Sequence, residues 1–265
     1  MLIIGESINS TVRQVGEAIS NRDEQFIVEL ARRQVVAGAG MLDVNVAVAE
    51  GDEAENLVWA ARTIQSAVNV PLVLDSRQPE ALEAALQVHQ GRPIINSISG
   101  EERRLRQLLP LVAKHDCGVI LLCLDDGGIP KTPPARCEVA KYLVDQMTGA
   151  GIDPERLYVD PLIMAVGSDW QAPRVALDTL RRLRDVLPSA HTVAGTSNVS
   201  FGMPQRSLLN RTFLAMAIAH GLEAFLVNVE DKAMMATLWA ADALMGNDTY
   251  CSAYLDAYHA GRLAT

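Results

Sequence analysis

The stretch PLVLDSRQPEALEAALQVHQGRPIINSIS, residues 71–99, contains the pattern that decides the fold. An apolar run at 71–76 is followed by an amphipathic segment with Pro79 in its first turn and Gly91 after its end, and a second apolar run follows at 93–98. Proline is favoured in the first turn of a helix, and glycine directly after one. The stretch therefore predicts a strand, a helix and a second, parallel strand.

The same unit repeats along the chain. Short runs rich in Val, Ile and Leu are expected to form strands at residues 2–6, 41–46, 71–76, 93–98, 118–124, 157–162, 192–198 and 224–229. Amphipathic stretches are expected to form helices, among them residues 23–37, 52–68, 101–115, 133–149, 173–187 and 206–220. Continuous apolar runs are typical of parallel strands that are covered on both faces. The pattern predicts an α/β fold, a single (βα)8 barrel domain over residues 1–265.

An open doubly wound sheet is the alternative to the barrel. It is disfavoured because no GxGxxG motif follows the first apolar run and no GxxxxGK[ST] motif occurs in the chain. A closed barrel therefore remains the expectation.

Composition narrows the class of protein. The chain has 265 residues, of which 49% are hydrophobic and 21% charged, and no apolar run approaches the ~20 residues that span a bilayer. The formal net charge of -9 disfavours nucleic acid and anionic membranes as partners. The cysteines form no CxxC pair, which argues against a disulfide framework or a zinc site. A cytoplasmic protein is expected.

Polar residues stand at the end of nearly every expected strand. They are Glu6, Asn9, Asp43, Asn45, Asp75, Ser76, Asn96, Ser97, Asp125, Asp160, Asn198, Ser200 and Asn228. Any one of them could be a helix cap or a turn residue. Because the carboxyl ends of barrel strands meet at one face, the whole set predicts a mouth that hydrogen-bonds a flat, polar, largely uncharged ligand.

Other chemistries lack their residues at these positions. The lysines and histidines fall in or beside expected helices and loops, so neither a Schiff base nor a histidine-ligated metal site is expected. A phosphosugar would find only Gly195 and the cation Arg206 near the seventh strand. No bound metal is predicted.

Several segments together are similar to a known family. They are LDVNV (42–46), LVLDS (72–76), IINSIS (94–99), GIPK (128–131), LYVDPLI (157–163), TSNVSFG (196–202) and LLNRTFLAMA (208–217). With MLIIGESIN at the start, they make the chain resemble, end to end, the methyltetrahydrofolate:corrinoid protein methyltransferases. This pterin-binding group of anaerobic one-carbon metabolism also resembles the folate module of cobalamin-dependent methionine synthase and shares its barrel with dihydropteroate synthase.

The resemblance implies which residues contact the substrate. It assigns the pterin-holding positions to Asp75, Asn96 and Asp160, and the asparagine that reaches the methylated nitrogen N5 to Asn198. A pterin offers an amino group and a ring N–H beside a carbonyl oxygen, so carboxylates and an amide suit its edge. Pocket-lining positions are implied for Asn45, Ser97, Arg206 and Asn228. Arg77, Gln78, Asp125 and Asp126 differ from the family pattern, and no role is predicted for them.

The resemblance also implies the reaction. A methyl group would pass, in either direction, between N5 of tetrahydrofolate and the Co(I) of a corrinoid. The corrinoid would be carried by a partner protein, because this chain has no cobalamin-binding histidine signature. The amide of Asn198, with ordered water, would stabilise the N5-protonated transition state. A homodimer is expected. Two alternatives remain: a dihydropteroate synthase-like condensation enzyme and a non-catalytic folate-binding subunit.

Overall fold

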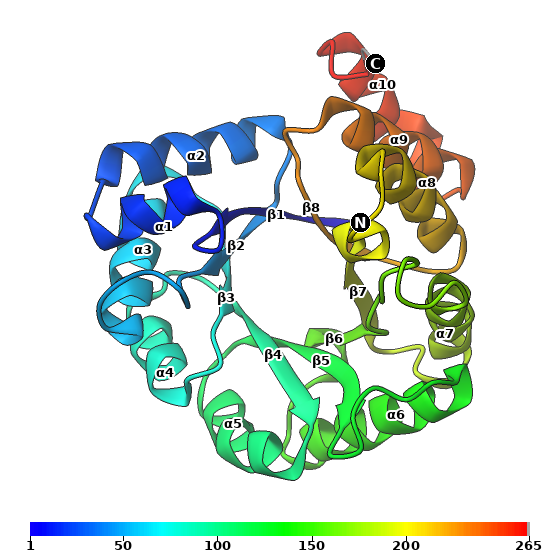
Figure 1. Cartoon of the computed structure of the whole chain (residues 1–265), viewed down its shortest axis with the longest axis horizontal. Helices are drawn as coiled ribbons and strands as arrows, with labels where there is room; N and C mark the ends of the chain where they lie inside the picture. The colour runs from blue at the N-terminus through cyan, green and yellow to red at the C-terminus, as the bar shows by residue number, and fades with distance from the viewer. Residues whose placement is uncertain (264–265) are drawn as a thin grey trace.

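The computed structural model describes residues 1–263 and shows a closed parallel barrel (Figure 1). Its strands are β1 (Leu2–Asn9), β2 (Met41–Asn45), β3 (Leu72–Asp75), β4 (Ile94–Gly100), β5 (Gly118–Asp125), β6 (Leu157–Asp160), β7 (His191–Gly195) and β8 (Ala224–Val227). Each strand pairs in parallel with the next, and β8 closes the barrel onto β1. The expected barrel is confirmed, and the open-sheet alternative is wrong.

Helices surround the barrel in Figure 1, and α10 lies at its outer edge beside α9. They are α1 (Arg13–Ser20), α2 (Glu24–Ala37), α3 (Glu53–Ala67), α4 (Pro79–Val88), α5 (Glu102–Lys114), α6 (Pro133–Gly149), α7 (Ala172–Val186), α8 (Arg206–Ala219), α9 (Lys232–Leu244) and α10 (Ser252–His259). Three 3-10 helices join them, η1 (Pro154–Arg156), η2 (Thr196–Ser200) and η3 (Thr249–Cys251). The six helices named from the sequence are present, whereas α1, α9 and α10 were not anticipated.

Local side-chain chemistry explains several helix ends. The Asp23 carboxylate accepts a hydrogen bond from the Phe26 backbone N–H at 3.0 Å, which caps the start of α2. Gly38, directly after α2, has a φ of 115°, a conformation that costs other residues free energy. Pro79 opens α4, as its position after the third strand predicted.

The seventh strand differs from its expected boundary. It ends at Gly195 instead of residue 198, and the following residues form η2. The Phe201 N–H donates to the Asn198 carbonyl at 3.2 Å, and the Met203 N–H donates to that of Ser200 at 2.9 Å. The TSNVS segment therefore leaves the barrel wall and places Asn198 on a short helix above the mouth.

Two apolar clusters hold the barrel together. A small cluster fills its interior and consists of Ile4, Met41, Val73, Ile94, Ile120, Val193 and Ala224. The strand residues that alternate with these belong to the large cluster that packs the barrel wall against the helices. Because neighbouring strand residues face opposite sides, the next inward position lies two residues further along each strand. The interior cluster thus forms the floor beneath the mouth.

Within residues 1–263, no helix is long and apolar enough to cross a membrane.

Candidate functional site at the barrel mouth

A layer of polar residues lies directly above the apolar floor. Glu6, Asp43, Asp75, Asn96, Asp160 and Asn228 each follow an interior residue of their strand by two positions. Asn45, Asp75 and Asn96 occupy one register row across β2, β3 and β4. The tertiary structure therefore brings side chains from six strands to a single face, where the fold places its chemistry.

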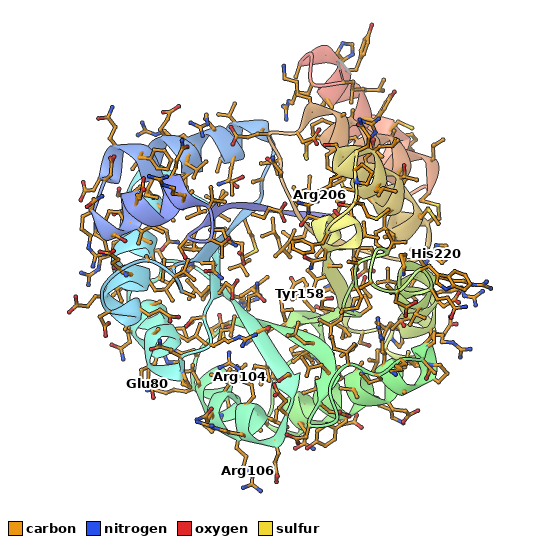
Figure 2. The ribbon with its side chains drawn as sticks, viewed as in Figure 1. Glu80, Arg104, Arg106, Tyr158, Arg206 and His220 are labelled. Atoms are coloured by element: carbon orange, nitrogen blue, oxygen red, sulfur yellow. The ribbon has the colours of Figure 1, made fainter. Side chains whose placement is uncertain are left out.

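Two adjoining cavities open at this face. The first, of about 700 Å³, is lined by side chains that include Glu6, Asp43, Asp75, Asn96, Asn198, Arg206 and Asn228. The second, of about 840 Å³, shares Asp75 and Asn96 and extends to Ser97, Arg77, Arg103, Arg104 and Asp126. Figure 2 shows Arg206 and Arg104 on opposite sides of the central opening. A ligand the size of a pterin has room between them.

Hydrogen bonds from β2 orient two of the predicted pterin contacts. Asn96 donates its Nδ2 to Asp43 Oδ1 at 3.1 Å, and Asn45 donates its Nδ2 to Asp75 Oδ2 at 2.7 Å. In this arrangement Asn96 keeps its Oδ1, and Asp75 keeps its Oδ1, to accept from a ligand. The mouth therefore presents acceptors, which match the N–H donors of a pterin edge.

Burial makes the carboxyl groups of the mouth weak acids. Burial raises the pKa of Glu6 to about 7, although the Arg206 guanidinium and the Asn228 backbone N–H act against this rise. Burial raises the pKa of Asp160 to about 6. The pKa of Asp75 is raised by burial, and that of Asp43 lies well above its usual range because of burial and the nearby Asp75 carboxylate. Near neutral pH this mouth can hold protons.

Asp160 stands at the start of a loop that a buried arginine supports. Its Oδ1 accepts from the Leu162 backbone N–H at 2.7 Å. Arg136 on α6, only 3% exposed, donates to the carbonyl oxygens of Pro161 at 2.7 Å and Leu162 at 2.8 Å. The Arg136 charge also lowers the pKa of Asp160, against the effect of burial. Arg136 therefore supports the loop after β6 and the carboxyl group that begins it.

The predicted site residues fall into three groups. Asp75, Asn96, Asn198, Arg206 and Asn228 line the first cavity, and Ser97 lines the second. Asn45 and Asp160 line neither cavity. Asn45 is engaged in hydrogen bonds with the Asp75 carboxylate and the Ala47 N–H. Asn228 accepts from the Glu230 N–H at 3.0 Å, the turn contact that a strand-end asparagine often makes. Ligand contacts for these residues stay predictions.

Sequence reasoning did not assign Glu6, Asp43, Arg104 or Arg136 to the site. Glu6 and Asp43 stood among the strand-end residues, and their spacing of two from Ile4 and Met41 is the signal that identifies them. The arginines lie within helices, and their sequence neighbourhood carries no such signal. Arg104 donates to the backbone carbonyl oxygens of Ser97 at 3.0 Å and Ser76 at 2.9 Å, which joins the ends of β3 and β4.

Three of the four residues without a predicted role make hydrogen bonds to other parts of the protein. Asp125 accepts from the Gly127 N–H at 2.8 Å and so forms a turn. Asp126 accepts from the Glu102 N–H at 3.1 Å at the start of α5. Gln78 donates its side-chain amide to Glu53 at 2.7 Å, while Arg77 is exposed beside the second cavity.

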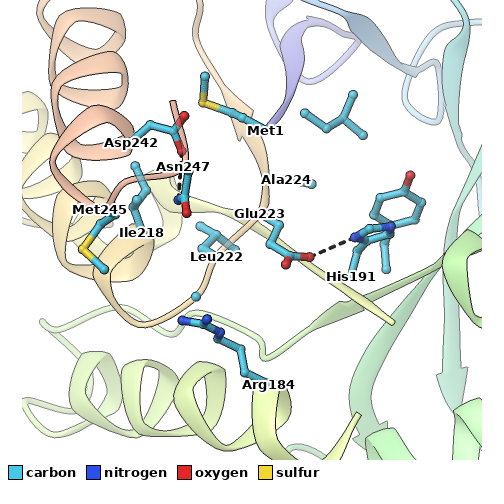
Figure 3. A pocket seen from close by; sticks show the side chains of 13 residues that line it. Met1, Arg184, His191, Ile218, Leu222, Glu223, Ala224, Asp242, Met245 and Asn247 are labelled. Atoms are coloured by element: carbon cyan, nitrogen blue, oxygen red, sulfur yellow. Dashed lines mark hydrogen bonds and ion pairs between the residues drawn. The ribbon is translucent and has the colours of Figure 1, made fainter. Parts of the chain in front are cut away.

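A separate cavity of about 500 Å³ lies at the opposite end of the barrel (Figure 3). There His191 pairs with Glu223 at 2.9 Å, and Asn247 donates to Asp242 at 3.1 Å. Its polar groups are largely paired with one another, and this face of a (βα)8 barrel generally contributes stability. Across residues 1–263, no group of three or more His, Cys, Asp and Glu side chains is arranged to hold a metal ion.

Comparisons with known proteins agree with the polar mouth. Residues 5–228 match the family of pterin binding enzymes. A methylcorrinoid:tetrahydrofolate methyltransferase of Eubacterium limosum is 33% identical over 265 residues, which cover 99% of this chain and 98% of that protein. Methionine synthase of Mycobacterium tuberculosis is 29% identical over 241 residues, which cover 86% of this chain and 20% of that protein. The chain thus spans about a fifth of that enzyme's length.

Solved structures show the same fold. Dihydropteroate synthase from Xanthomonas albilineans in complex with 7,8-dihydropteroate has a TM-score of 0.66 and 21% identity, with 92% of both chains covered. The Clostridium difficile dihydropteroate synthase, solved in the presence of pteroic acid, has a TM-score of 0.72 and 18% identity, with 92% of this chain and 96% of that chain covered. The family match covers most of the chain, and the resemblance inferred from the sequence is confirmed. The chain therefore belongs to the pterin binding enzyme family and, within it, is a methyltransferase similar to the folate–corrinoid enzymes.

Proposed function

We propose that this enzyme transfers a methyl group between N5 of methyltetrahydrofolate and the Co(I) corrinoid of a partner corrinoid protein. The observation that carries the proposal is the end-to-end similarity to a methylcorrinoid:tetrahydrofolate methyltransferase. The acceptor-rich mouth is consistent with it, because Asp75 and Asn96 line the cavities where a pterin edge can donate to them.

Asn198 is proposed as the catalytic residue. It is exposed on η2 and lines the same cavity as Asp75 and Asn96. The folate amine N5 is a good leaving group for methyl transfer only when it acquires positive charge. The Asn198 amide is a neutral group that can stabilise the protonated N5. Glu6, whose pKa burial raises to about 7, is one of the weakly acidic carboxyl groups of this cavity, beside Asp43 and Asp75.

The cofactor arrangement follows from the same proposal. The corrinoid supplies the cobalt that exchanges the methyl group with N5, and we propose that it arrives on another protein. The mouth carries exposed Trp170 (78%) and Phe201 (72%) on the loops after β6 and β7. The proposed enzyme is a cytoplasmic homodimer whose chain binds no metal, and it transfers the methyl group in either direction.

Two other functions are less well supported. A dihydropteroate synthase-like condensation needs cations for a pyrophosphate, and the mouth cavities offer arginines such as Arg206 and Arg104, but the end-to-end similarity is to a methylcorrinoid:tetrahydrofolate methyltransferase. The solved dihydropteroate synthases share the fold at 21% identity or less. A non-catalytic folate-binding subunit would keep the same pterin contacts but would not need Asn198.

Single-turnover kinetics test the proposal. The protein is mixed with methyltetrahydrofolate and reduced cobalamin, and Co(I) absorbance is followed by stopped flow. Asn198→Ala should slow transfer at saturating folate by about 10²-fold or more, with a smaller loss of binding. Asn21→Ala, at the exposed end of α1, is the control. No transfer by the wild type refutes the function, and a normal rate in Asn198→Ala refutes the role of Asn198.

A further inference from the structure

Arg206, the first residue of α8, holds both sides of the segment that carries Asn198. Its Nη2 donates to the Ser197 carbonyl at 2.9 Å, and its Nε donates to the Ser200 hydroxyl at 3.1 Å. These acceptors come one residue before and two residues after Asn198. Figure 2 shows Arg206 next to η2 at the edge of the mouth. One guanidinium thus bridges two points of a five-residue helix.

The bridge is partly shielded from water. Ser200 is fully buried and also donates weakly, at 3.4 Å, to the Ser197 carbonyl. The Arg206 guanidinium lies over the Phe201 ring, 5.9 Å from its centroid. The backbone of the loop after β6 adds one more hydrogen bond to η2, since the Val166 N–H donates to the Val199 carbonyl at 2.9 Å. Arg206 itself is exposed, but hydrogen bonds from a charged donor are stronger than those between neutral groups.

The segment needs such support. A short 3-10 helix has poor hydrogen-bond geometry and little cooperativity, so it opens easily when nothing else fixes it. Asn198 is exposed and is not held by any hydrogen bond of its side chain to another described residue. Its position above the cavity therefore depends on the backbone of residues 196–200, and Arg206 is the side chain that ties this backbone to α8.

We propose that Arg206 is a positioning residue that holds residues 196–200 so that Asn198 faces the reacting N5. The proposal rests on the catalytic role proposed for Asn198, and it differs from the pocket-contact role that the sequence implied for Arg206. A lysine cannot replace the guanidinium of Arg206, because a single ammonium group cannot span the two acceptors with the same planar geometry.

The first test separates positioning from folate binding. Arg206→Met should lower the single-turnover rate about 10- to 100-fold, because small misplacement of a catalytic group has that effect, and should change the Kd of methyltetrahydrofolate less. Arg206→Lys, which keeps the charge, should recover only part of the rate. Ser200→Ala removes one of the two acceptors and should cost about 2- to 10-fold. Arg211→Met on the same helix, which does not line the cavity, is the matched control.

The second test asks whether Arg206 acts through Asn198. In the Asn198→Ala background, Arg206→Met should have no further effect on the rate, since the group it positions is gone. Multiplicative losses, or a full rate in Arg206→Lys, would overturn the proposal by showing that Arg206 acts by its charge on Glu6 or on the substrate.

The third test needs no activity. Hydrogen–deuterium exchange of residues 196–201 should accelerate at least about tenfold in Arg206→Met and less in Ser200→Ala, with the strands unchanged. Unchanged exchange in this segment would refute the positioning role of Arg206 even if the rate of methyl transfer fell. If Asn198→Ala keeps the wild-type rate but exchange responds as described, Arg206 still holds residues 196–200, and the proposed catalytic role of Asn198 fails.

Discussion

Replacing Glu6 with glutamine should stabilise the ligand-free protein at alkaline pH. Burial raises the pKa of Glu6 from 4.5 to about 7. In the unfolded chain Glu6 ionises above about pH 4.5, whereas in the folded chain it stays protonated up to about 7. The folded state therefore binds more protons in this window, and its stability falls as the pH rises from about 4.5 to about 7. Above pH 7 this loss is complete and constant.

The size of the effect follows from the same pKa difference. At about 1.4 kcal/mol per pKa unit, a rise of about 2.5 corresponds to roughly 3 kcal/mol, an upper bound because the open mouth admits water. Glutamine resembles the neutral acid and does not ionise. The variant should therefore match the wild type at pH 4 and exceed it by about 1–3 kcal/mol at pH 8, which is roughly 2–12 °C in Tm for a chain of this length.

Calorimetric melting from pH 4 to pH 8, without folate, measures the difference. Glu29→Gln, on the exposed side of α2, is the matched control and should run parallel to the wild type. The other carboxyl groups of the mouth contribute their own pH dependence to every variant, so the informative quantity is the gap between the Glu6→Gln and wild-type curves. A gap that stays constant across the range, or that closes at alkaline pH, would show that Glu6 is not a weak acid in the folded protein.

Other expectations are simpler to test. Asp75→Ala or Asp160→Ala should weaken methyltetrahydrofolate binding by about 1–3 kcal/mol because pterin donors lose their acceptors; isothermal titration that gives unchanged affinity in both would exclude the proposed pocket. Light scattering at micromolar concentration should give the mass of a dimer, and a monomer mass would contradict the expected homodimer. Dialysis against a chelator should leave methyl transfer intact, whereas loss of activity that is reversed by adding a metal would show that the chain binds one.

The amino-acid sequence by itself determined the architecture and the face that carries the chemistry. Its eight apolar runs alternate with amphipathic segments, and a right-handed succession of such units closes a barrel whose polar strand ends meet at one mouth. Asp75 and Asn96 could be identified in this way, because each ends an apolar run that is recognisable without any tertiary information. Their adjacency in one register row then followed from the parallel pairing of β3 and β4.

Only the tertiary structure decided which contacts hold these groups and how far their pKa values are raised. Arg136 lies within α6, and its neighbours in sequence do not show that its guanidinium reaches the carbonyl oxygens of Pro161 and Leu162, about 25 residues further along the chain. Burial of Asp43 and Glu6 depends on closure of the barrel around them, so their raised pKa values could not be read from local sequence. The TSNVS segment reads as the end of a strand, yet hydrogen bonds from the Arg206 side chain and from the distant Val166 N–H help to hold it as a 3-10 helix. Local sequence specifies the pattern of elements because backbone propensity and apolar periodicity are short-range, whereas desolvation and long-range hydrogen bonds arise only when distant segments meet.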